Sequence, residues 1–152
     1  MNETVQIITL ILSAQLSYYD PALCLLPDPV LWKNCYDRER WWTMAAGNDA
    51  RENYGLALAC PEEFPIGSRW TLPGIRGDEY TPRQSWVCLD RGGSVTTSID
   101  DEFRVTVVLD LLLPYRIVSD RVPVIYHGPL PDKLLQRIER EMMERVYSHG
   151  RN

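Results

Sequence analysis

Short apolar runs alternate with turn-forming residues along most of the chain. The runs occupy residues 4–19, 56–60, 69–72, 85–89, 103–113 and 122–126, with prolines and glycines spread between them. Runs of this length that are bounded by turn residues predict β-strands. The first run ends at Asp20-Pro21, where proline disfavours further regular structure. We therefore expect a mainly β domain that begins with a long strand.

The periodicity changes near the C-terminus, beyond Pro131. Apolar residues then recur at steps of three and four, with charged residues between them: Leu134, Leu135, Ile138, Met142 and Val146. This spacing predicts an amphipathic α-helix over residues 131–147. We divide the chain accordingly into a barrel domain at 1–128 and a helix with a tail at 129–152.

The N-terminal run has two interpretations. Residues 5–12 are apolar, and Leu12-Ser13-Ala14 resembles a signal-peptidase cleavage site. The residues before this run include Glu3 and no lysine or arginine, which favours a β-strand over a signal peptide. The run is also too short to span a membrane, so we expect no membrane span.

Composition narrows the function classes. The chain has 152 residues, 45% of them hydrophobic, which suits one globular core. Its 16 basic and 21 acidic residues give a net charge of −5, which argues against nucleic-acid binding. The cysteines and the two histidines, His127 and His149, match no metal-binding spacing. We expect neither a metal nor a cofactor.

Residues 20–53 form a long region with prolines, two cysteines and the pair Trp41-Trp42. A loop of this length is usually functional or cross-linked, and we expect a Cys24–Cys35 disulfide to hold it. Two disulfides in all would suit an oxidising compartment, whereas four reduced thiols are the alternative.

Five short motifs follow one another in a suggestive order. They are Tyr18-Tyr19, Thr43-Met44-Ala45-Ala46-Gly47, Pro65-Ile66-Gly67-Ser68, Asp90-Arg91-Gly92-Gly93 and Val108-Leu109-Asp110-Leu111. This series resembles the one found in RlpA-like and 3D domains, and the match covers roughly residues 14–126. The sequences around Cys60 and Cys88 also resemble members that carry a disulfide there.

The resemblance implies a six-stranded double-psi β-barrel. It also implies a cell-wall polysaccharide, above all peptidoglycan, as the target, because the family includes lytic transglycosylases and glycan-binding relatives. By position, Asp110 corresponds to the catalytic acid/base, and Asp90 lies beside it. The chain departs from the family pattern in its longer, acidic segment at 94–104 and in lacking Lys-Gly after Gly92-Gly93.

Each candidate residue also has a structural interpretation. Asp110 interrupts an apolar strand, where burial would raise its pKa, although it could instead bond to a turn. Asp90 precedes two glycines and could simply form a turn. Tyr18, Tyr19 and Thr43 could line a glycan cleft, and Trp41 or Trp42 could stack on a sugar ring. The alternative for each of these five residues is that its side chain simply packs within the fold.

Three functions remain open on these grounds. The chain could be a glycan-cleaving enzyme, a glycan-binding barrel, or a structural subunit such as a bacteriophage tail or virion protein. The last interpretation rests on the N-terminal strand and the C-terminal helix, since an edge strand and an apolar helix face can both contact other subunits. All three place the protein outside the cell, in the envelope or on a virion.

Overall fold

The computed structural model describes residues 9–25, 42–72, 85–92, 94–114 and 119–149. Seven strands lie in this part of the chain: β1 (Thr9–Tyr19), β2 (Ala57–Ala59), β3 (Arg69–Thr71), β4 (Ser85–Asp90), β5 (Thr97–Ile99), β6 (Val105–Leu112) and β7 (Ser119–His127). Two short 3-10 helices, η1 (Pro21–Leu25) and η3 (Ala50–Glu52), and one α-helix, α1 (Asp132–His149), complete it.

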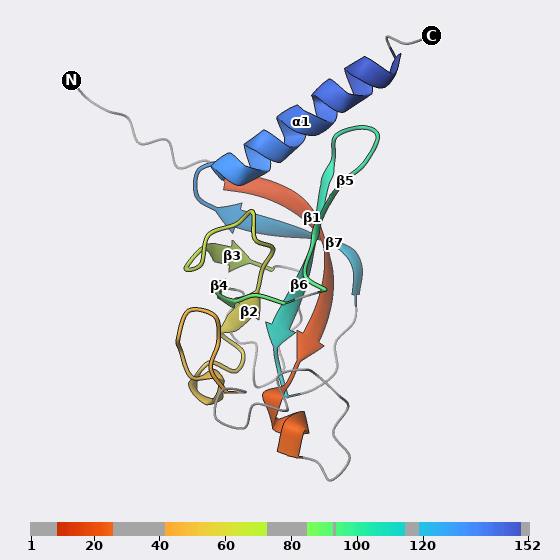
Figure 1. Ribbon diagram of the computed structural model, residues 1–152. Helices are drawn as coiled ribbons and strands as arrows, with labels where there is room; N and C mark the ends of the chain where they lie inside the picture. Colours follow the sequence, from red (N-terminus) through yellow and green to blue (C-terminus); the bar gives the residue numbers. More distant parts are fainter. Residues whose placement is uncertain (1–8, 26–41, 73–84, 93, 115–118, 150–152) are drawn as a thin grey trace, which may run out of the picture.

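The strands close into a mixed barrel (Figure 1). Their order is β1-β7-β3-β4-β2-β6, and β6 returns to pair with β1. The β1–β6 and β2–β4 pairs are parallel, and the others are antiparallel. β5 adds to β6 as an antiparallel hairpin. The prediction of a small, mainly β, six-stranded barrel with a C-terminal helix is therefore confirmed.

Alternation along the strands sorts side chains to the two sides of the barrel wall. Leu12, Ala14 and Leu16 of β1 are buried, and so are Val107, Leu109 and Leu111 of β6. They share one core cluster with Phe64, Trp70 and Tyr126, whose rings meet edge to face at centroid distances of 4.9 to 5.1 Å. Because successive strand residues point to opposite faces, Asp110 must face away from this core.

The acidic segment at 94–104 contains a strand that the sequence did not indicate. Thr97–Ile99 forms β5, and only its tip is a turn. Asp100 closes that turn by accepting hydrogen bonds from the backbone of Glu102 and Arg104 and from the Arg104 side chain, each at 2.9 Å. A three-residue strand leaves too weak an alternation to be recognised from sequence.

Helix α1 lies across one end of the barrel (Figure 1). Its first two turns are anchored, because Leu134 is buried in the main core and Arg137 pairs with Glu63 at 2.8 Å. Farther along, the Arg145 guanidinium lies 4.3 Å from the centroid of the Phe103 ring on the β5–β6 hairpin. The predicted helix is thus confirmed; the domain boundary at residues 128 and 129 stays a prediction.

The predicted Cys60–Cys88 disulfide is present and joins the end of β2 to β4, with 5.8 Å between the Cα atoms. Cys24 has no free thiol, but Cys35, its expected partner, lies outside the described residues. Residues 1–8, which include the first five residues of the expected N-terminal strand at 4–19, also lie outside them. No helix in the described part of the chain is long and apolar enough to cross a membrane.

Candidate functional site

The two candidate aspartates lie on either side of strand β2. Ala59 of β2 is in register with Asp90 of β4 on one side and with Asp110 of β6 on the other. Neighbouring strands are about 4.8 Å apart. This pairing therefore puts the two aspartate backbones roughly 10 Å apart, with strand β2 between them. A bulge between Leu58 and Ala59 shifts the register and gives Asp90 its place opposite Ala59.

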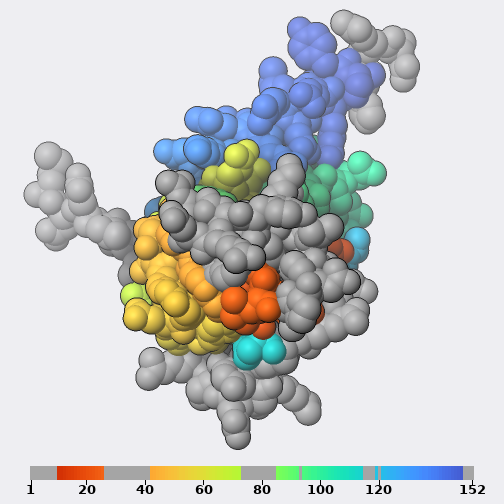
Figure 2. Space-filling view, turned by 60° about the horizontal axis from the view of Figure 1, so that its bottom comes forward, coloured from red at the N-terminus to blue at the C-terminus, as the bar shows by residue number. Residues whose placement is uncertain are grey.

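A second apolar cluster covers this outward side of the wall. Met44, Ala50, Ala57 and Leu112 are its buried members, and Tyr19, Trp42, Tyr54 and Leu89 pack against it. Leu112 lies two residues after Asp110 on the same side of β6. The segment 42–54 therefore removes water from a face of the barrel that would otherwise be exposed. Figure 2 shows this segment, in orange, at the surface beside η1.

Asp90 fastens that covering segment to the barrel. Its Oδ1 accepts hydrogen bonds from the backbone N–H of Ala45 at 3.0 Å and of Arg91 at 2.9 Å. Its Oδ2 accepts one from the Tyr19 hydroxyl at 3.0 Å. Three donors hold the carboxylate in one orientation, so Asp90 is a positioning residue more than a group free to react.

Asp110 is held differently. Burial raises the pKa of its carboxyl from the ordinary 3.8 to about 6, and the nearby charge of Asp90 adds to the rise, while a hydrogen bond from Ser94 opposes it. Close to Asp110 the chain has a glycine: a Cβ atom at Gly92 would lie 3.7 Å from the Asp110 Oδ2. Asp110 can therefore change its protonation near neutral pH, as a general acid must.

Tyr19 donates its hydroxyl to Asp90 and feels the charge of Asp110. Burial and the Asp90 carboxylate strongly raise the pKa of its hydroxyl, so it remains a protonated donor. A similar pair lies nearby, where the Tyr54 hydroxyl donates to Asp20 and the pKa of Tyr54 is raised mainly by burial. Asp20 in turn accepts from the Ala22 N–H at 3.0 Å at the start of η1.

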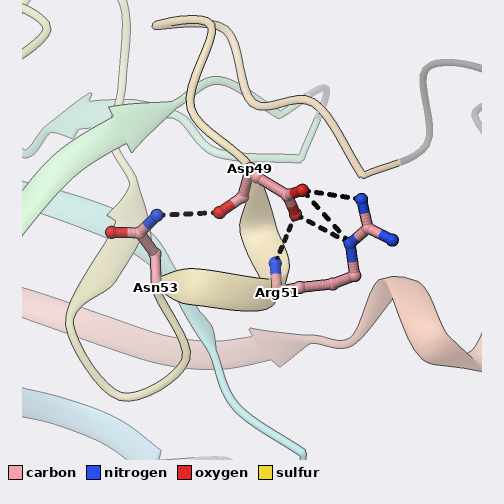
Figure 3. Close-up of polar contacts among 3 residues, drawn as sticks. All are labelled: Asp49, Arg51 and Asn53. Atoms are coloured by element: carbon pink, nitrogen blue, oxygen red, sulfur yellow. Dashed lines mark hydrogen bonds and ion pairs between the residues drawn. The ribbon is translucent and has the colours of Figure 1, made fainter.

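The covering segment has its own internal support. Asp49 accepts hydrogen bonds from the backbone and the guanidinium of Arg51, the shortest at 2.7 Å, and its carbonyl accepts from the Asn53 side chain at 2.8 Å (Figure 3). The Arg51 guanidinium also lies 5.2 Å from the centroid of the Trp42 ring. Thr43 and Asp49 form an isolated β-bridge that closes the loop.

The structure thus gathers only some of the predicted glycan-binding residues. Tyr19 bonds to Asp90, whereas Tyr18 packs against the main core. Trp42 packs against the covering cluster and under Arg51, and Thr43 is exposed. Trp41 lies outside the described residues.

Sequence reasoning missed several contributors. Ser94 and the backbone of Ala45 carry no signal of their own, because a hydrogen bond to a distant aspartate depends on the fold. Asp20 was interpreted only as a strand end, although Asp before Pro is also a frequent helix cap, which could have indicated its role. Among the described residues, no group of three or more His, Cys, Asp or Glu side chains could hold a metal ion.

The raised pKa of Asp110 gives a stability prediction. The folded state holds the proton up to about pH 6, whereas the unfolded chain releases it near pH 3.8. Protonation thus favours the folded state, and stability falls as the pH rises through 6, by about 1–2 kcal/mol for a partly buried group. Urea unfolding at pH 4 to 8 measures this fall, which Asp110→Asn should remove; identical pH profiles for the two proteins would contradict it.

Comparison with known proteins found no matching family model, no matching curated protein and no matching solved structure.

Proposed function

We propose that this barrel cleaves the glycan strands of bacterial peptidoglycan as lytic transglycosylases do, with Asp110 as the general acid/base, in the cell envelope or on a virion. The observation that carries the proposal is the Asp110 carboxyl, whose pKa burial raises to about 6 at a site that two other polar side chains share. Raised pKa values of this kind gather at functional sites. The motif series around both aspartates supports the same chemistry.

The reaction needs one carboxyl group. Protonated Asp110 gives its proton to the glycosidic oxygen while the bond from that oxygen to the sugar C1 breaks. The C6 hydroxyl of the same sugar then attacks C1, and the Asp110 carboxylate takes its proton. The products are a 1,6-anhydro sugar end and a new free hydroxyl end, no water is consumed, and Asp110 returns to its protonated state.

Asp90 and Tyr19 support this step without exchanging protons with the substrate. Asp90 fixes the covering segment through the Ala45 N–H, and its negative charge helps to keep Asp110 protonated. Tyr19 holds Asp90 in place. Because Asp90 is already occupied by three donors, it is poorly placed to activate water, which favours transglycosylation over hydrolysis.

The test is product release. Purified peptidoglycan incubated with the protein from about pH 4 to pH 8 should yield muropeptides that end in a 1,6-anhydro sugar, identified by mass spectrometry. Activity should fall as the pH rises above about 6, because the acid must be protonated. No release of such products at any pH in this range would overturn the proposal.

Asp90→Asn should move this fall in activity to lower pH. Removing the like charge lowers the pKa of Asp110, so that about two- to threefold less of it is protonated at neutral pH. Tyr19→Phe is the matched control, since it removes one hydrogen bond to Asp90 and leaves the charge. The pH–rate profile is measured for both variants. If activity in Asp90→Asn fell at the same pH as in the wild type, Asp90 would not act on Asp110.

A second function, a non-catalytic subunit built on the same barrel, is favoured by helix α1. Its distal turns expose apolar side chains, among them Met143, Val146 and Tyr147 at 61%, 70% and 67%. A surface of this kind suits contact with another protein or a wall component. Sedimentation with purified cell walls that persists in Asp110→Asn and is lost in Val146→Asp, without product release, would select binding through α1 over cleavage.

A further inference from the structure

The side of α1 that faces away from the barrel is apolar. Five of its side chains are exposed, by fractions that run from 39% to 70%: Leu135, Met142, Met143, Val146 and Tyr147. Steps of three, four and seven residues place them along one side of the helix, and we call this set the outer stripe. Apolar helix faces normally pack on a core or on a partner, so the outer stripe is a surface that lacks its contact.

The barrel does not supply that contact, because it packs on another side of α1. Leu134 and Ile138 already join the main core, and the Arg145 guanidinium lies on the Phe103 ring. In both Figure 1 and Figure 2 the C-terminal half of α1 extends past the barrel. Within the described part of the chain, the outer stripe is therefore left open to a partner.

One edge of the outer stripe carries charges that are not paired. Lys133 and Arg140 lie seven residues apart on this edge, and Glu144 follows four residues later. All three are exposed, and none of them forms an ion pair with another described residue. The edge thus changes from basic to acidic along the helix.

This charge order is complementary to itself when the direction of the helix is reversed. In a twofold pair of antiparallel helices the same edges meet, so the basic part of one faces the acidic part of the other. Placing Arg140 opposite Glu144 of a second copy makes this contact twice and brings Met142 of both copies together at the axis. A parallel neighbour would instead set Arg140 against Arg140, and like charges repel.

We propose that α1 pairs with α1 of a second copy of this chain, antiparallel and through the outer stripe, with Arg140 of each copy opposite Glu144 of the other. Glu139, which lies within the stripe, is then in reach of the Tyr147 hydroxyl of the second copy. A standard interface has about 20–30 residues a side, so this smaller one should dissociate with a Kd on the order of 10 µM. The pairing uses the surface on which the second function rests, and it holds whether or not the barrel cleaves glycan.

Sedimentation velocity of the full chain tests the pairing. From about 1 to about 200 µM, the wild type should change from a monomer of 17.6 kDa to a dimer. Val146→Asp should stay monomeric throughout, because it would bury unpaired carboxylates between the helices. Ile11→Asp is the matched control, since Ile11 is 75% exposed on β1, and it should dimerise like the wild type. A wild type that stays monomeric at the highest concentration would overturn the proposal.

Charge reversal tests the antiparallel arrangement. Arg140→Glu and Glu144→Arg should each self-associate about tenfold more weakly, because each sets like charges opposite one another at two symmetric places. An equimolar mixture of the two variants should dimerise at least as well as the wild type, because every contact then joins opposite charges. Glu52→Arg, the same charge change on the distant η3, should leave dimerisation unchanged. A mixture no better than its components would refute this arrangement.

The same variants separate self-pairing from other roles of α1. If the wild type stayed monomeric and Val146→Asp lost sedimentation with cell walls, the outer stripe would bind a wall component, and self-pairing would be refuted. A dimer that releases no anhydro product would uphold the pairing and refute cleavage. Cleavage by a strictly monomeric protein would do the reverse.

Discussion

Asp110→Asn is expected to lower the release of anhydro-muropeptides by at least about 100-fold. General acid–base catalysis contributes roughly 10²- to 10⁴-fold, and an amide of the same shape cannot supply the proton. The fold should persist, because the change removes a partly buried charge and keeps the side-chain volume. Product release by mass spectrometry and a thermal melt of the same sample measure the two effects together.

Asp101→Asn provides the matched control for this variant. Asp101 is an exposed aspartate on the tip of the β5–β6 hairpin, away from the site, and its replacement should leave both activity and stability unchanged. If Asp110→Asn kept half or more of the wild-type rate while Asp101→Asn behaved as expected, Asp110 would not be the general acid.

The second large effect concerns the Cys60–Cys88 disulfide. The double change Cys60→Ala with Cys88→Ala should lower the free energy of unfolding by about 3.5 kcal/mol, the loop-entropy estimate for a separation of 28 residues. Both cysteines are fully buried, so small packing losses add to this figure. Urea unfolding measures the change.

This disulfide also bears on the site, because Cys60 follows Ala59 and Cys88 lies two residues before Asp90. Loosening β2 from β4 there should reduce activity under conditions where the double variant is still folded. The single change Cys60→Ser leaves Cys88 as a free thiol and should be as unstable as the double variant. A loss below about 1 kcal/mol in the double variant would show that the strand pairing, and not the bond, holds this end of the barrel.

The local parts of the fold could be predicted from sequence because they depend on local patterns. The three- and four-residue steps from Leu134 to Val146 predict α1, which begins within one residue of the expected position. The apolar runs likewise predict the barrel strands. Asp110 stands out because a carboxylate within β6 breaks an otherwise apolar run.

The position of the covering segment at 42–54 could not be predicted, since it depends on contacts between distant residues. The Asp90 bonds join residues 45 and 71 positions apart in the chain. They make Asp90, which the sequence Asp90-Arg91-Gly92-Gly93 would suit to a simple turn, the anchor of the covering segment. The same holds for the anchor of α1, where Glu63 meets Arg137 across 74 positions. Closure of the barrel brings these residues together, and no local pattern records it.

The most direct test of the central claim is the pKa of Asp110 itself. Carboxyl carbons titrated by NMR, with the Asp110 signal assigned by its absence in Asp110→Asn, would report this value in the folded protein. The structure predicts a midpoint of about 6, set mainly by burial of the carboxyl and raised further by Asp90. A midpoint near the ordinary 3.8 would mean that Asp110 is ionised at neutral pH, and would contradict its role as the acid.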